Sequence, residues 1–142
     1  MKSQEQAICD LTLEWLEGWR IEGDKQWTSE YFRPLQVEDE VLVVDDYGGH
    51  LYVFTGNEGY RTVWGPLVEQ YMEQWKIGPD GDIKVKVSGD LAVSSFILIG
   101  GGTLKDGSIG KLRQYCTFVW ERRDGDWKMS IEHISTDPEY ST

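Results

Sequence analysis

The first part of the sequence has the hydrophobic spacing of amphipathic helices. In the first of these segments Ile8, Leu11, Trp15 and Trp19 recur every three or four positions, and Leu16 widens the apolar stripe. This spacing gathers their side chains on one face of a helix. A second, shorter segment carries Trp27 and Tyr31 and ends at Pro34, because proline lacks the N–H that a helix interior requires. The pattern therefore predicts two N-terminal helices within residues 1–33.

Two short extended segments and a longer helix follow. The apolar runs 41–44 and 51–54 flank Gly48-Gly49, a combination that is typical of a β-hairpin. Apolar residues at helical spacing then predict a long helix over residues 57–76. Pro66 is expected to kink or split this helix.

The rest of the chain has the pattern of strands. Asp-Gly pairs at 106–107 and 124–125 indicate tight turns on either side of a long strand at 109–121. Strands joined by such short turns are antiparallel neighbours, so residues 82–135 are predicted to form an antiparallel meander. The triple glycine at 100–102 lies within a strand pattern and predicts a bulge or a sharp bend.

These elements together predict an α+β fold. Helices come first and a meandering sheet follows, which favours a curved, mostly antiparallel sheet wrapped around the N-terminal and central helices. The sequence contains no repeat and no long linker. We therefore expect a single domain over residues 1–142, with residues 136–142 as a short tail.

Composition narrows the classes of partner. The 142 residues carry a formal net charge of −11, which disfavours contact with phosphate backbones and anionic lipids. We expect no nucleic-acid partner and no membrane partner, and no apolar run approaches the roughly 20 residues of a membrane span. Cys9 and Cys116 are too few and too far apart for a disulfide framework, and no secretory signal is visible. These features favour a cytoplasmic protein.

The C-terminal part of the sequence resembles a known superfamily. Residues 117–128, TFVWERRDGDWK, followed by the EHIS of residues 132–135, resemble the last two strands of NTF2-like proteins. The similarity is greatest to the SnoaL-like and ketosteroid-isomerase-like branch. The resemblance implies a cystatin-like cone with a deep apolar pocket, and usually a homodimer. Members of this superfamily include isomerases, cyclases, dehydratases and non-catalytic binding domains, so the fold alone does not determine the function.

His133 is the first candidate for catalysis. Imidazole exchanges protons near neutral pH, and strict alternation from Trp127 and Met129 would point His133 inward together with Ile131 and Ser135. The alternative is a core histidine whose ring nitrogens are satisfied by the backbone or by Ser135.

Two further groups are candidates for the chemistry. One residue of the Asp45-Asp46 pair should face inward, and we favour Asp46 as a second base or as the group that orients His133; the alternative is ordinary turn chemistry. Arg113 and Tyr115 share one face of the long strand. If that face lines the pocket, Arg113 could hold a carboxylate and Tyr115 could donate to a carbonyl. If it faces outward, both are surface or dimer-contact residues.

Aromatic residues are candidates for the pocket wall. The ligand-binding set consists of Trp15, Trp19, Tyr52, Trp64 and Arg113. The alternative for the aromatic members is simple core packing. Since His50 and His133 are the only histidines, we expect no metal site, and the predicted chemistry needs no cofactor.

The sequence therefore predicts a pocket protein for a small apolar organic molecule. The predicted activity is that of a cofactor-free isomerase, cyclase or dehydratase that acts by general acid/base chemistry on a carbonyl or hydroxyl compound. His133, Asp46 and Tyr115 are the predicted catalytic residues. The alternative is a non-catalytic ligand-binding or oligomerisation module of the same fold.

Overall fold

A computed structural model describes residues 2–141 of the chain, so Met1 and Thr142 of the predicted domain lie outside the described residues. Six strands form one sheet in the order β2-β1-β6-β5-β4-β3. The strands are β1 (Leu42–Asp45), β2 (Tyr52–Thr55), β3 (Lys76–Ser88), β4 (Leu91–Thr103), β5 (Ile109–Arg123) and β6 (Asp126–Thr136). The helices and helical turns are α1 (Gln4–Gly18), α2 (Ser29–Phe32), η1 (Arg33–Leu35), η2 (Tyr47–Gly49), α3 (Gly56–Gly59), η3 (Tyr60–Trp64) and α4 (Gly65–Tyr71).

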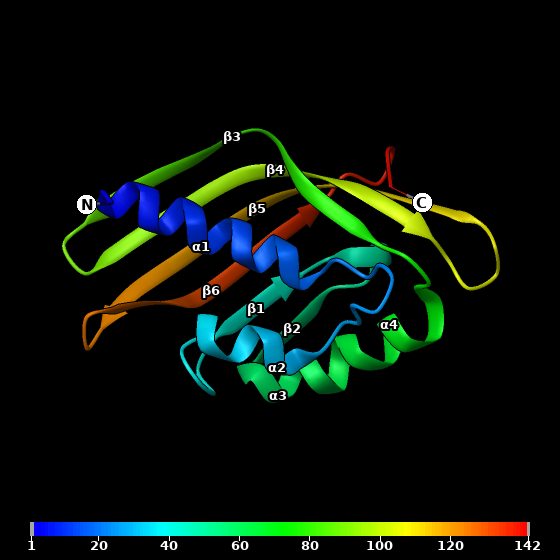
Figure 1. Ribbon diagram of the computed structural model, residues 1–142, viewed down its shortest axis with the longest axis horizontal. Coiled ribbons are helices and arrows are strands. Elements are labelled where there is room, and N and C mark those ends of the chain that lie inside the picture. Colours follow the sequence, from blue (N-terminus) through cyan, green and yellow to red (C-terminus); the bar gives the residue numbers. More distant parts are fainter. Residues whose placement is uncertain (1, 142) are drawn as a thin grey trace.

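The sheet is curved and mixed, which confirms the α+β class. Each strand from β3 to β6 pairs antiparallel with the next along the chain, and β1 and β2 form the predicted hairpin. β1 joins the meander through a parallel pairing with β6. Figure 1 shows α1 lying across the sheet, while α2, α3 and α4 gather beside β1 and β2. The helices therefore cover one face of the sheet and leave the other free.

The first of the two predicted N-terminal helices, α1, runs from Gln4 to Gly18. The Ser3 side chain accepts a hydrogen bond from the Gln6 backbone N–H at 3.1 Å and so caps the first turn of α1. At the end of the helix, Tyr31 and Phe32 pack directly against Gly18, where a Cβ would collide with both rings. The buried face of α1 consists of Ile8, Thr12, Trp15, Leu16 and Gly18.

The central helix is shorter than the sequence predicts. Helical structure runs from Gly56 to Tyr71, so the predicted end at residue 76 is wrong. The stretch that follows is pinned in extended form by backbone bridges, in which Met72 pairs with Leu104 and Trp75 with Ile21. Ahead of Pro66 the helix widens into one π turn, and the backbone at Trp64 and Gly65 stays helical, so the proline does not split the helix.

The three consecutive glycines permit a close approach of strands rather than a bulge. Gly100, Gly101 and Gly102 keep an unbroken register with β5. A Cβ at these positions would collide with the backbone of Lys76, Gly110 and Gln74, respectively. The predicted bulge is therefore wrong here. The register of β5 with β6 shifts instead between Val119 and Trp120.

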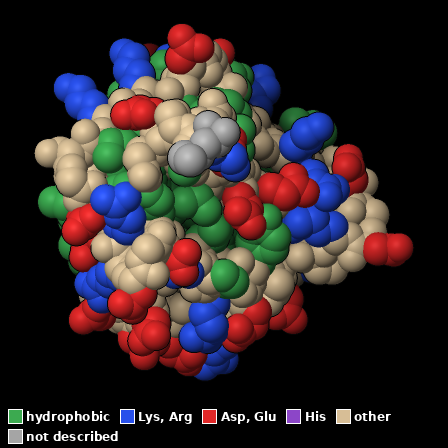
Figure 2. Space-filling view, turned by 60° about the vertical axis from the view of Figure 1, so that its left-hand side comes forward, with side chains coloured by type: hydrophobic (Ala, Val, Ile, Leu, Met, Phe, Trp, Pro, Cys, Tyr) green, Lys and Arg blue, Asp and Glu red, His purple; other side chains and the backbone are tan. Residues whose placement is uncertain are grey.

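Charged side chains of both signs are spread over the surface. Figure 2 shows the end of the molecule near the start of the chain, where acidic and basic groups alternate around a band of hydrophobic side chains. Within residues 2–141, no helix is long and apolar enough to cross a membrane.

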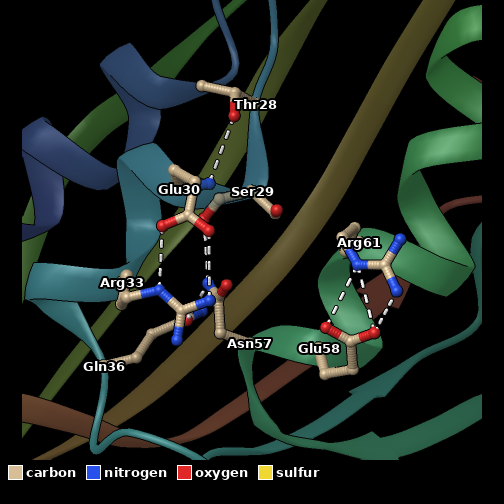
Figure 3. A network of polar contacts seen from close by, with 8 residues as sticks. All are labelled: Thr28, Ser29, Glu30, Arg33, Gln36, Asn57, Glu58 and Arg61. Carbon is tan, nitrogen blue, oxygen red and sulfur yellow. Dashed lines mark hydrogen bonds and ion pairs between the residues drawn. The ribbon is translucent and has the colours of Figure 1, made fainter.

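A buried amide network joins α2 to α3 (Figure 3). The Nδ2 group of Asn57 donates to the Ser29 carbonyl oxygen and to Oε1 of Gln36, both at 2.8 Å. Asn57 and Gln36 are buried. In contrast, the nearby Glu58–Arg61 ion pair is exposed on both sides. The network fixes the short helix α2 against the start of the central helix.

We expect Asn57→Ala to lower the free energy of unfolding by about 1–3 kcal/mol, because it leaves two buried acceptors unpaired. Arg61→Ala is the matched control and should change the free energy of unfolding by no more than about 0.5 kcal/mol, since its ion pair is solvent-exposed. Urea denaturation measures both changes. A larger loss for Arg61→Ala than for Asn57→Ala would contradict the assigned role of the amide network.

Candidate active site in the sheet cavity

A β-bulge at Ser130 decides which residues of β6 face inward. Val119 pairs with Ile131 and Trp120 with Met129, so Ser130 is left over in the ladder. The extra residue moves every later side chain to the opposite face. Met129 is buried before the bulge, and Glu132 and Ile134 are buried after it.

The predicted inward orientation of His133 is therefore wrong. His133 is exposed, as are Ile131 and Ser135, because all three lie beyond the bulge. The residue that takes the inward place is the neighbour of His133, Glu132, which is 1% exposed. The structure gives His133 no contact with the cavity described below.

The acidic pair at the end of β1 is also placed differently from the sequence prediction. Asp45 follows Val41 and Val43 on the buried face of the strand and is 6% exposed. Asp46 points elsewhere, and its Oδ1 accepts a hydrogen bond of 2.6 Å from the Thr136 backbone N–H. The preference for Asp46 as the inward residue is therefore wrong, and Asp45 faces the interior.

Asp45 and Glu132 line the same cavity between the sheet and the helices. The space open to the centre of a water molecule is about 50 Å³. A single water needs roughly 10–15 Å³ by this measure, so the cavity admits a small guest. Four lining side chains are polar: Asp45, Tyr47, Gln114 and Glu132. The others are apolar or aromatic: Trp15, Trp19, Trp64, Leu67, Val68, Met72, Trp75, Ile77, Leu112 and Ile134.

The Glu132 carboxyl is held by two side chains from different elements. Its Oε1 accepts hydrogen bonds from the Tyr60 hydroxyl of η3 and from Nε1 of Trp15 on α1, the latter at 3.1 Å. The Trp15 N–H also lies 3.0 Å from the Tyr60 hydroxyl oxygen. Oε2 of Glu132 has no hydrogen-bond partner among residues 2–141. One oxygen is thus fixed, and the other is available to a bound molecule.

The two carboxyls are diagonal neighbours on adjacent strands. Asp45 of β1 pairs with Ile134 of β6, and Glu132 pairs with Val43. Burial raises the pKa of Asp45 to about 7, and the nearby charge of Asp46 adds to this effect. Burial raises the pKa of Glu132 to about 8, again with a smaller contribution from the charge of Asp45. Between these values the pair holds about one proton, so one group can act as an acid and the other as a base.

Arg113 and Tyr115 of β5 face away from the cavity. The sequence leaves open whether this face of the strand points inward or outward, and the structure shows that it points outward. Tyr115 is 46% exposed, and its hydroxyl accepts a hydrogen bond of 2.8 Å from Ser95. Nη1 of Arg113 lies 3.0 Å from a carboxylate oxygen of Asp137. Tyr115 and Arg113 are therefore surface residues of the outer sheet face, and Gln114 between them is the residue that lines the cavity.

The predicted aromatic wall is largely in place geometrically. Trp15, Trp19 and Trp64 line the cavity. Tyr52 does not line it, but its ring packs against Trp64 with centroids 4.9 Å apart and so supports the wall from behind. Within the described part of the chain, no group of three or more His, Cys, Asp or Glu side chains is placed to hold a metal ion.

The sequence does not identify Glu132 or Tyr60 as site residues, and it presents Asp45 only as the less favoured member of the Asp45-Asp46 pair. For Asp45 a signal exists, since it continues the alternation of Val41 and Val43. For Glu132 the signal is weaker. Met129 and Ile134 are both apolar, but strict strand alternation would place them on opposite faces, which indicates an irregularity between them. Tyr60 occupies a helix position typical of a core residue and has no signal of its own.

Comparisons with known proteins agree with this architecture. Residues 21–138 match the SnoaL-like domain family. Comparison with curated proteins gives no match. An NTF2-like superfamily protein of Salmonella enterica serovar Typhimurium is 16% identical with a TM-score of 0.76, covering 93% of this chain and 89% of that one. A hexachlorocyclohexane dehydrochlorinase, LinA-type3 of Novosphingobium barchaimii, is 21% identical with a TM-score of 0.74, covering 96% and 86%. At these identities the similarity shows a shared fold.

The buried carboxyls should make the protein less stable as the pH rises. The pKa of Glu132 moves from 4.5 to about 8 on folding, so the folded chain retains a proton that the unfolded chain releases. The free energy of unfolding should fall across this interval, by up to about 1.4 kcal/mol per pH unit for each such group. Glu132→Gln should make the free energy of unfolding, measured by urea denaturation from pH 5 to 8, depend less steeply on pH. The decrease in slope equals the contribution of Glu132 to the pH dependence.

Glu58→Gln, which alters an exposed carboxyl, is the control. Its free energy of unfolding should depend on pH as steeply as that of the wild type. If Glu132→Gln and the wild type have parallel pH profiles, Glu132 is charged in the folded protein, and the site described here is wrong.

Proposed function

The chain belongs to the SnoaL-like domain family and has the NTF2-like fold, and on this premise we propose that it is a cofactor-free enzyme for a small neutral carbonyl or hydroxyl compound. Asp45 and Glu132 carry the acid/base chemistry in place of the predicted His133, Asp46 and Tyr115. The observation that carries this proposal is the pair of buried carboxyls on the wall of an otherwise apolar cavity.

The two carboxyls suit complementary roles. The pKa of Asp45, about 7, makes its ionised form available near neutral pH, where it removes a proton from a carbon next to a carbonyl group. The pKa of Glu132, about 8, keeps this group protonated under the same conditions. Since Oε1 of Glu132 accepts from Tyr60 and Trp15, the proton resides on Oε2 and is donated to the substrate oxygen.

The outcome depends on where the protons go next. Return of the Asp45 proton to a different carbon gives an isomerisation. Loss of a hydroxyl group as water, with the proton supplied by Glu132, gives a dehydration. The similarity to a hexachlorocyclohexane dehydrochlorinase supports a compact apolar substrate in this fold. The alternative remains a binding module that holds the same class of compound without turnover.

Proton abstraction can be tested without knowledge of the product. We expect the wild type to accelerate the exchange of α-protons of neutral cyclic ketones for deuterium in D₂O, followed by NMR with cyclohexanone and 1-tetralone. Asp45→Asn and Glu132→Gln should each reduce the exchange rate by a factor of about 100 or more, because each removes a proton-transfer group.

His133→Gln is the matched control, since it alters the residue next to Glu132 on the exposed side of β6. It should leave exchange unchanged. Binding of these ketones without any accelerated exchange would favour the non-catalytic module, and loss of exchange in His133→Gln alone would contradict the assignment of Glu132.

We further propose that the protein is a homodimer that associates through the outer face of the sheet. This face presents the partly exposed Ile131 and Tyr115 on adjacent strands, on the side that the helices leave uncovered. Both cysteines are free, which suits the reducing cytoplasm that we propose as its location.

Sedimentation equilibrium tests this association. The wild type should have twice the 16.3 kDa mass of the chain, and Ile131→Lys should reduce it to a single chain with an unchanged circular dichroism spectrum. The dimer would be excluded by a wild type that sediments as a single chain at all concentrations.

A further inference from the structure

Two tryptophans of the cavity wall have hydrogen-bond donors that the protein does not use. The Nε1 atoms of Trp19 and Trp64 are buried and have no partner among residues 2–141. Both rings line the cavity, and Trp64 as a whole is only 5% exposed. A buried N–H without a partner costs about 1–3 kcal/mol, so such groups usually have a ligand or an ordered water as partner.

The rings packed around these two indoles are aromatic, and no described residue accepts a hydrogen bond from either Nε1. Trp19 contacts the rings of Phe32 and Tyr60, with centroids 5.7 and 6.4 Å away. Trp64 packs against Tyr52 and Phe54, with centroids 4.9 and 5.8 Å away. The faces of such rings accept hydrogen bonds only weakly. The two indoles also lie against each other, with centroids 6.4 Å apart and planes at 73°.

A third tryptophan with a buried, unpaired indole N–H lines a different part of the protein. Nε1 of Trp27 also lacks a partner among the described residues. However, the Trp27 ring lines an outer groove between the segment after α1 and the central helix rather than the cavity. Of these three buried indole N–H groups of the described residues, those of Trp19 and Trp64 belong to rings that line the cavity.

We propose that Trp19 and Trp64 donate hydrogen bonds to a second oxygen of the bound compound, while its reacting oxygen lies at Glu132. This inference rests on the proposed function and narrows the substrate to compact ring compounds with two oxygen acceptors, such as cyclic diketones and hydroxyketones. The indole rings supply the apolar contact, and their N–H groups select for the additional oxygen. A hydrocarbon group at that position would leave both donors unpaired.

The charge of the site requires this second acceptor to be neutral. None of the described cavity-lining residues is lysine or arginine, whereas Asp45 and Glu132 are both carboxylic acids. A carboxylate or phosphate on the ligand would face this pair without a counter-charge. A carbonyl or hydroxyl oxygen accepts from indole N–H groups without that cost.

A matched pair of ligands isolates the second oxygen. 1,4-Cyclohexanedione and cyclohexanone have the same ring and differ by one carbonyl. In ¹H–¹⁵N spectra of the wild type, the dione should shift the indole N–H signals of Trp19 and Trp64 downfield, and cyclohexanone should shift them less. Trp127 supplies the control signal, which should not move. Its ring does not line the cavity, and its N–H donates a hydrogen bond of 2.8 Å to Oε1 of Gln4.

Affinity gives the second readout. From the same titrations, the wild type should bind the dione about tenfold more tightly than cyclohexanone, which corresponds to about 1 kcal/mol of hydrogen bonding plus the twofold symmetry of the dione. Trp19→Phe and Trp64→Phe should reduce this ratio towards the factor of about two that symmetry alone provides. Trp127→Phe should preserve the full ratio.

If Trp19→Phe or Trp64→Phe fails to fold, the same tryptophan can be replaced by benzothienylalanine instead. This analogue retains the ring shape and has sulfur in place of the N–H, so it should lower the ratio without a change in packing. Equal affinity for both compounds in the wild type, no binding of either, or an unchanged ratio in the analogues would each overturn the inference. Since these readouts need no turnover, they can succeed where proton exchange fails, and the reverse is equally possible.

Discussion

The site depends on one carboxyl group that lies in the core without a cation to neutralise it. Glu132 is 1% exposed and, within residues 2–141, forms no ion pair. Its partners are a hydroxyl and an indole N–H, supplied by Tyr60 and Trp15. Burial without a counter-charge favours the protonated form, which makes Glu132 a proton donor at a pH where ordinary carboxyls are ionised.

Three parts of the fold converge on this carboxyl. α1 supplies Trp15, the π turn of the central helix supplies Tyr60, and the bulge of β6 turns Glu132 inward. Asp45 reaches the same wall because β1 pairs in parallel with β6. The cavity and its two buried carboxyls are thus consequences of how the helices and the strand hairpin close over one sheet face.

The sequence predicts the strands well because Asp-Gly turns and alternating apolar residues are local signals. It predicts the end of the central helix poorly, since Trp75 continues the helical spacing while its backbone pairs with Ile21. The error at His133 has a single cause. One extra residue at Ser130 reverses the face of everything after it, and a bulge of this kind has no dependable signature in one sequence. The contact between Glu132, Tyr60 and Trp15 is likewise tertiary.

The titration of Glu132 tests the central claim most directly. In protein labelled with ¹³C at the glutamate carboxyls, the Glu132 signal can be assigned by its absence from Glu132→Gln. We expect a titration midpoint at about 8. A midpoint at the ordinary value of 4.5 would show a charged, solvated carboxylate and would exclude Glu132 as a buried acid.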